Sequence, residues 1–237
     1  MQSYTRRQLK EDKFAKGTQE AVHWATEHRP VLIWSISALI VAAILLTGFL
    51  TWNSHRTEQA NIALSRALQT FSAPLRPVGA PPDPSTKTFA SIAERGKAAE
   101  KELQAVADQF THTKPGKMAR YLAGTAAIQA GDAAAAERLL KSSADDGDKN
   151  ISSLGKLALA NLYRSGNRPV DAAKLYKELI ENPTDTVSKG QAQLELAALY
   201  ESTDPKEAAN IYAQIQKEDP ASVAARIAAN KLAAAAK

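Results

Sequence analysis

The feature that most constrains this chain is a run of 22 residues, Val31–Trp52, that contains no charged side chain. As an α-helix the run is roughly 33 Å long, which is enough to cross a hydrocarbon layer of about 30 Å. Trp34 and Trp52 lie near its two ends, and indole rings favour the headgroup level of a bilayer. The run therefore predicts one transmembrane helix over residues 31–52.

A buried core helix and a cleaved signal peptide are the two alternatives for this run. The first is disfavoured because the rest of the chain is too polar to surround a helix that is apolar on every side. The second is disfavoured because thirty residues precede the run and no small-residue cleavage site follows it. We therefore expect the run to stay in the protein as an anchor.

Basic residues weakly favour one orientation of the anchor. Residues 1–30 hold six Lys or Arg, whereas the twenty residues after the run hold two, Arg56 and Arg66. Because basic residues favour the cytoplasmic side, we expect a cytoplasmic N-terminal segment, residues 1–30, and a C-terminal domain outside the cytoplasm. In a diderm bacterium this topology corresponds to a single pass through the inner membrane, with the C-terminal domain in the periplasm. Residues 5–28 are compatible with a short interfacial helix or with a solvated charged tail.

Hydrophobic periodicity predicts further helices after the anchor. Residues 53–72 are expected to form a post-membrane helix, because apolar residues from Ala60 to Phe71 recur on one helical face. Five prolines in residues 73–86 exclude a helix there and predict an extended, mobile connector. A helix is expected to resume at about Thr88 and to end within residues 111–116.

Three similar segments follow, at residues 119–143, 155–179 and 191–215. Each contains two small residues and a bulky residue four positions after the second, and the second small residues of neighbouring segments are 36 positions apart. This pattern predicts units of two antiparallel helices, whose apolar sides are buried only when the units stack. The small residues are Gly124, Ala160, Ala197, Ala136, Ala172 and Ala208, and the bulky ones are Leu140, Tyr176 and Tyr212.

The predicted fold class is therefore all-α. One N-terminal transmembrane helix is followed by an α-solenoid of antiparallel helix pairs over residues 87–237. An Ala-rich segment at about 221–236 is expected to be a C-terminal capping helix with a polar outer side.

No sequence pattern typical of catalysis or of metal binding is apparent. The four histidines are scattered, and residues 145–148 lack the ligand spacing of a calcium loop. The chain has no cysteine, which excludes disulfides, and its net charge of +5 is not gathered into a basic stripe. We therefore expect no enzyme, no cofactor, no metal, no small-molecule substrate and no nucleic-acid partner.

The repeats resemble the tetratricopeptide consensus, in which small residues, aromatic residues and a closing Pro recur at fixed positions. The second unit fits best, with Ala160, Tyr163, Ala172, Tyr176 and Pro183. The third unit fits nearly as well, whereas the first lacks the aromatic residues and the closing Pro. The resemblance implies a scaffold that binds other proteins.

The order of the segments also resembles one family, the ancillary SecYEG translocon subunits. Its members have a cytosolic segment, one span, a post-membrane helix and a periplasmic tetratricopeptide domain. Residues Trp52–His55, WNSH, and the helical segment after them are similar to the membrane exit of that family. The connector at 73–86 is longer than expected for it. The resemblance implies the Sec translocon, periplasmic chaperones or emerging chains as partners.

The tetratricopeptide resemblance further implies a partner-binding groove, lined by one face of each unit's first helix. Its mixture of apolar and polar side chains would suit an extended peptide, an unfolded segment or a partner's helix. The alternatives are that its leucines belong to the core and that its polar residues are ordinary solvated surface. The expected groove residues are Tyr121, Thr125, Ile128, Asn161, Arg164, Gln191, Leu194 and Glu201, and the same rule adds Met118, Leu154, Leu157 and Ala198.

Three functional hypotheses follow from these observations. The first is a scaffold at the secretion translocon and the periplasmic chaperone network. The second is an envelope-organising coordinator, for cell division or outer-membrane assembly. The third is a tetratricopeptide adaptor tethered with the opposite topology, so that it faces the cytosol.

The orientation is testable with a reporter fused after Lys237. Because residues 1–30 carry most of the basic residues near the run, we expect alkaline phosphatase fused there to be active and green fluorescent protein to be dark. The reverse pattern would support the cytosol-facing adaptor instead.

Overall fold

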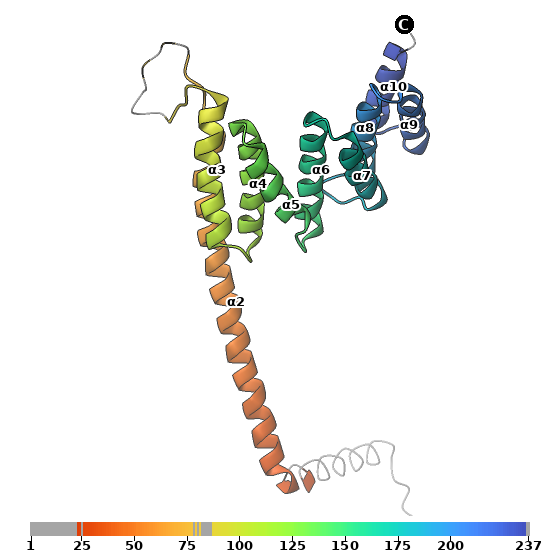
Figure 1. The fold of residues 1–237 in the computed structure, drawn as a ribbon. Coiled ribbons are helices and arrows are strands. Elements are labelled where there is room, and N and C mark those ends of the chain that lie inside the picture. The colour runs from red at the N-terminus through yellow and green to blue at the C-terminus, as the bar shows by residue number, and fades with distance from the viewer. Residues whose placement is uncertain (1–22, 25, 78, 80, 82–86, 236–237) are drawn as a thin grey trace, which may run out of the picture. The chain divides into compact units, whose positions relative to one another are not determined.

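The structure, a computed structural model, describes residues 23, 24, 26–77, 79, 81 and 87–235 (Figure 1). Within these residues the helices run in order from α2 to α10, and no β-strand is formed. The all-α prediction is therefore confirmed. The proposed interfacial helix falls largely on residues 1–22, outside the described residues. The chain divides into two compact units, Met1–His55 and Arg56–Lys237.

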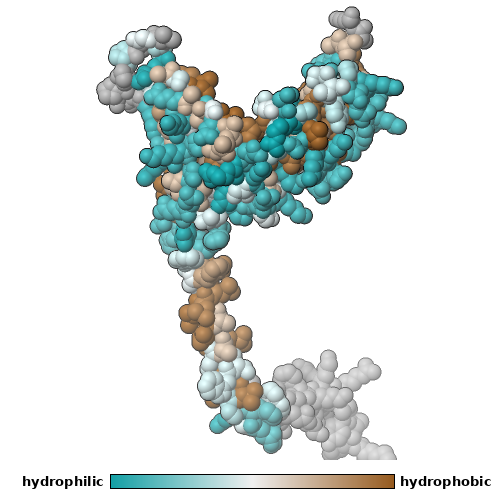
Figure 2. Space-filling model, in the orientation of Figure 1, coloured by the Kyte–Doolittle hydropathy of each residue, from teal (hydrophilic) through white to brown (hydrophobic). Residues whose placement is uncertain are grey.

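Helix α2, Arg29–Phe71, begins in the first unit and ends in the second. It contains both the apolar run and the post-membrane helix predicted from the sequence. Of the described helices it is the one long and apolar enough to cross a membrane, and none of its most apolar stretch is buried. Figure 2 shows apolar side chains gathered along the first part of α2. A candidate membrane anchor is thus present where the sequence predicts it.

One hydrophobic core of the compact unit Arg56–Lys237 combines four helices. The end of α2 packs with α3 (Ile92–Gln109), α4 (Lys114–Ala130) and α5 (Ala133–Ala144). Ala60 and Ala67 of α2 are both buried there, as the apolar stripe predicts. Arg56 Nη2 donates to the carbonyl oxygen of Gln109 at 3.0 Å, which satisfies one of the open carbonyls at the end of α3.

The two ends of the Pro-rich connector are joined to each other. Arg76 N donates to the Phe89 carbonyl at 2.8 Å, and Phe89 N donates to the Pro74 carbonyl at 3.2 Å. Ala73 and Phe89 are buried beside this isolated bridge. Residues 73–77 are therefore held in place rather than free, while residues 78, 80 and 82–86 lie outside the described residues.

Capping moves several helix boundaries away from the predicted positions. Helix α3 begins at Ile92 rather than about Thr88, because Ser91 Oγ accepts from Glu94 N at 3.1 Å. Residues 114–116, predicted to end that helix, form the first turn of α4, which Thr113 caps. The last helix, α10, is Val223–Ala235.

The three predicted repeat units are confirmed as helix pairs. They are α4 with α5, α6 (Lys149–Ser165) with α7 (Pro169–Glu181), and α8 (Lys189–Tyr200) with α9 (Pro205–Glu218). Gly131 and Asn167 turn the chain between helices with φ of 81° and 56°. Each of these left-handed conformations suits Gly or Asn.

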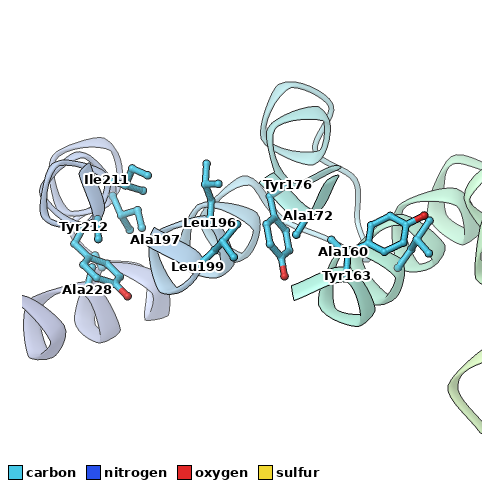
Figure 3. Close-up of a cluster of buried hydrophobic side chains, with 14 of the residues drawn as sticks. Ala160, Tyr163, Ala172, Tyr176, Leu196, Ala197, Leu199, Ile211, Tyr212 and Ala228 are labelled. Atoms are coloured by element: carbon cyan, nitrogen blue, oxygen red, sulfur yellow. The ribbon is translucent and has the colours of Figure 1, made fainter. Parts of the chain in front are cut away.

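Small residues lie at the helix contacts, as the repeat pattern predicts. Ala136, Ala160, Ala172, Ala197 and Ala208 are all buried. In the larger core, which spans α5 to α10, the ring of Tyr176 lies beside Ala172 and that of Tyr212 beside Ala228 (Figure 3). Ala228 of α10 therefore leaves room for the ring of Tyr212 of α9, whereas Ala172 and Tyr176 lie one turn apart on α7.

Gly155 marks a close approach of two consecutive repeat units, at the contact of α6 with the end of α5. A Cβ added there would lie 2.5 Å from the backbone nitrogen of Ala144 and 2.7 Å from the carbonyl carbon of Ser143. A backbone neighbour cannot move aside as a side chain can. We therefore expect Gly155→Ala to lower the free energy of unfolding by about 1–3 kcal/mol, although Ala otherwise favours a helix by about 1 kcal/mol.

Urea unfolding of the detergent-solubilised protein, followed by circular dichroism, measures this effect. Gly147→Ala is the matched control, because a Cβ there meets nothing within 4 Å, and we expect a change within about 0.5 kcal/mol. A Gly155→Ala protein as stable as the wild type would show that α5 and α6 do not meet so closely.

Candidate functional site

The candidate site is one surface of the compact unit Arg56–Lys237, which we call the inner face. It is formed by the first helices of the three repeat units, α4, α6 and α8, and by α10. Helix α4 packs against α6, and α8 packs against α10. The eight expected groove residues lie on α4, α6 and α8, with Glu201 at the C-cap of α8. The structure therefore places all eight on helices that follow one another along the stack.

Three of these side chains are open to a partner. Ile128 is 42% exposed, and Gln191 is exposed with no side-chain hydrogen bond to any described residue. Tyr121 packs against the larger core, and this burial raises the pKa of its phenol. Its hydroxyl has no hydrogen-bond partner in the described part of the chain. Together they offer an apolar contact and groups able to donate hydrogen bonds.

A polar cluster joins α6, α7 and α8 at the inner face. The Tyr176 hydroxyl donates to Asn161 Oδ1 at 2.6 Å. Arg164 Nη1 pairs with Glu195 Oε2 at 2.8 Å, which links α6 to α8. Burial raises the pKa of Tyr176 to about 12, with Glu195 adding to the rise and Arg164 opposing it. Arg164 is thus already engaged, and a partner's carboxylate would have to compete with Glu195 for it.

A second cluster joins α8, α9 and α10. Glu201 Oε1 accepts from the Tyr212 hydroxyl at 2.8 Å and pairs with Lys231 Nζ at 3.0 Å. The hydrogen bond from Lys231, and to a lesser extent that from Tyr212, lowers the pKa of Glu201, whereas burial acts to raise it. The three side chains, together with Leu232, line a hollow of 360 Å³ between α9 and α10. Glu201 is therefore both a link between helices and part of a cavity wall.

The remaining expected residues serve mainly in packing. Leu154 is partly buried against the small core around Val187, and Leu157 and Leu194 are partly buried against the larger core. The Thr125 hydroxyl donates to the Leu122 carbonyl of its own helix at 2.8 Å. The alternative interpretation, that the leucines belong to the core, therefore describes them well.

A carboxylate at the junction of α5, α6 and α7, Glu137, was not predicted from the sequence. Glu137 accepts from Lys141 Nζ at 2.7 Å, from Tyr163 Oη at 3.0 Å and from Arg168 Nη1 at 3.1 Å. The Arg168 guanidinium also lies 3.9 Å from the centroid of the Tyr163 ring. These hydrogen bonds, that of Lys141 foremost, lower the pKa of Glu137 to about 2. A signal was available, because a buried tyrosine hydroxyl needs a partner.

In the described part of the chain, no group of three or more His, Asp or Glu side chains is placed to hold a metal ion. The polar clusters instead consist of tyrosines, carboxylates and basic groups that pair with one another across helix boundaries. Such pairs link neighbouring helices, and those of Arg164 and Glu201 involve residues of the inner face. The arrangement is therefore suited to holding a shape and to binding.

The fold and the inner face define a helical-repeat protein of the tetratricopeptide type. Residues 23–178 match the family described as tetratricopeptide repeat-like domain, and because the match covers more than half of the chain, the protein belongs to this family. The matched range includes the apolar part of α2 and ends within α7. No curated protein and no solved structure matches the chain.

The Glu137 cluster predicts a dependence of stability on pH. A carboxylate whose pKa falls from 4.5 to about 2 on folding stabilises the fold fully above about pH 4.5 and loses this effect as the pH falls towards 2. Glu137→Gln should lower the free energy of unfolding at pH 7 by about 1 kcal/mol, and should flatten its fall between pH 4.5 and 2.

Denaturant unfolding at several pH values, with intact protein in detergent, measures both effects. Glu181→Gln is the control, because Glu181 is exposed and forms no ion pair with a described residue. Some slope should remain in Glu137→Gln, since hydrogen bonds from Lys189, Gln214 and Gln193 lower the pKa of Glu218 to about 2 as well. An unchanged slope would argue against the cluster.

Proposed function

We propose that this protein is a membrane-anchored tetratricopeptide scaffold that binds other polypeptides through its inner face. The observation that carries the proposal is the range of the family match, residues 23–178, which includes both the apolar helix and the repeat stack as far as α7. A chain with both parts keeps a binding domain close to a lipid surface.

The anchor is supported by the exposure of the apolar part of α2. A helix in the core of a soluble protein buries its apolar side chains, whereas Trp34, Leu39 and Leu45 are 77%, 71% and 68% exposed. Lipid provides the environment in which such a helix is stable, because its backbone hydrogen bonds are satisfied within the helix.

The inner face supports binding of a polypeptide rather than of a small molecule. Ile128 supplies an apolar contact, and Tyr121 and Gln191 supply hydrogen-bonding groups on two different helices. A peptide in extended or helical form carries both apolar side chains and unsatisfied polar groups along its length, and so matches such a surface.

For the cellular setting we propose the secretion translocon. The resemblance of the segment order, and of residues Trp52–His55, to ancillary SecYEG translocon subunits supports this setting. The chain would lie in the bacterial inner membrane with its repeats in the periplasm, and its partners would be Sec components, periplasmic chaperones or emerging chains. An envelope-organising role and a cytosol-facing adaptor are the competing outcomes.

Photocrosslinking in native membranes tests the proposal. A photoreactive amino acid in place of Ile128 should give adducts that include a Sec component, a periplasmic chaperone or an emerging chain, because Ile128 is open at the inner face. The control position is Lys217, an exposed residue of α9, the second helix of the third unit. We expect adduct yields at least about fivefold lower there, because hot-spot contacts concentrate in a small part of an interface.

The possible outcomes separate the two parts of the proposal. Equal yields at both positions would contradict the inner face as the binding surface. Adducts that form at Ile128 but contain only cell-division or outer-membrane assembly proteins would keep the inner face and exclude the translocon.

A further inference from the structure

A second surface of the repeat domain has the features of a docking site and involves none of the expected groove residues. A hollow of 510 Å³ lies between the start of α7 and the end of α8. We call it the α7 hollow. It is lined by Pro169, Val170, Ala173, Lys174, Lys177, Tyr200 and Thr203.

The floor of the α7 hollow is apolar and open. Val170 is 81% exposed, the highest value among the exposed large hydrophobic residues of the described chain. Val170, Ala173 and Lys177 follow one another at helical spacing, so that one face of α7 is directed to the hollow. The Tyr200 hydroxyl has no hydrogen-bond partner among the described residues. An apolar side chain beside a hydrogen-bond acceptor would therefore complement this surface.

The rim of the hollow is positively charged. Lys174 and Lys177 are exposed and form no ion pair with any residue that the structure describes. Other lysines of the repeats do form such pairs, for example Lys156 with Glu178 at 3.0 Å. None of the three acidic residues of α7 pairs with either lysine: Asp171 is occupied by Arg168 Nε at 2.8 Å, Glu178 by Lys156, and Glu181 is exposed and forms no ion pair with a described residue. The two lysines therefore keep their charge available for an outside carboxylate.

We propose that the α7 hollow docks an acidic amphipathic helix of a partner protein. Its aliphatic side chains would pack on Val170 and Ala173, and carboxylates one turn away would pair with Lys174 and Lys177. Charge complementarity selects this occupant, because an apolar groove with two unpaired lysines favours apolar residues flanked by Asp or Glu. The proposal does not depend on the function of the inner face, since α7 is a second helix of its unit.

Fluorescence anisotropy with a defined probe tests this proposal. The full-length protein is placed in nanodiscs of phosphatidylcholine, and the probe is a fluorescein-labelled helical peptide with two leucines flanked by glutamates at one-turn spacing. We expect saturable binding that weakens with salt. Lys174→Glu with Lys177→Glu should weaken binding about tenfold, because two attractive pairs become repulsive, and Val170→Ser should weaken it about threefold.

The matched control is Lys97→Glu with Lys101→Glu, which reverses two exposed lysines one turn apart on α3. Its affinity should stay within about twofold of the wild type, because surface charges far from the probe are screened. Circular dichroism shows whether each variant keeps its fold. The lysine variants keep the test informative if Val170→Ser is unstable, since both lysine side chains are exposed.

Four results would overturn the proposal. Binding that is equal in the Lys174/Lys177 variant and the wild type would remove the role of the charges. Equal binding of a peptide with lysines in place of the glutamates would remove the acidic character of the occupant. Adsorption to phosphatidylglycerol vesicles that the double variant loses, without peptide binding, would identify a lipid surface. Self-association that Val170→Ser abolishes in sedimentation, without peptide binding, would identify a second copy of the chain.

Discussion

The close approach of helices through glycine and alanine is the constraint on which the rest of the repeat domain depends. Gly124 faces the side chain of Leu140, and Gly155 faces the backbone at the end of α5. At such distances dispersion contacts are dense, and larger residues at these positions would force helices apart. Because each helix pair leaves an apolar side that only the next pair covers, the domain is held by a chain of contacts between neighbours. The position of every inner-face residue follows from these contacts.

Features that repeat along the sequence could be predicted, and features that join distant residues could not. The spacing of Ala136, Ala172 and Ala208 predicts the pairing of helices, because small residues recur where two helices meet. The apolar part of α2 is likewise visible from local composition. The Arg164–Glu195 pair is different, because its members are 31 positions apart and nothing in the sequence selects Glu195 from the other carboxylates as the partner of Arg164. The backbone hydrogen bonds of Pro74 and Arg76 with Phe89 could not be predicted either. The prolines between these residues indicate only that no helix forms there.

The candidate groove shows why position in a repeat does not determine the role of a side chain. Ile128, Asn161 and Glu201 were assigned by one positional rule, yet Ile128 is open whereas Asn161 and Glu201 receive tyrosine hydroxyls. The difference comes from the second helix of each unit. Where the second helix carries a buried tyrosine, the tyrosine hydroxyl needs an acceptor on the first helix. The first repeat unit has Leu140 at that position, and leucine needs no hydrogen-bond partner. The first repeat unit therefore leaves more of its inner face unengaged, and the α7 hollow adds a separate surface between the start of α7 and the end of α8.

The distribution of aromatic residues has an optical consequence. All three tryptophans, Trp24, Trp34 and Trp52, precede the compact unit Arg56–Lys237. Five of the six tyrosines, by contrast, lie on α4 and on the helices from α6 to α9. Light absorbed selectively by indole rings thus reports on the part of the chain that precedes the repeats, where Trp34 and Trp52 lie on the apolar helix. Tryptophan fluorescence of the unmodified chain therefore follows departure of the anchor from lipid without a contribution from tryptophans in the repeats.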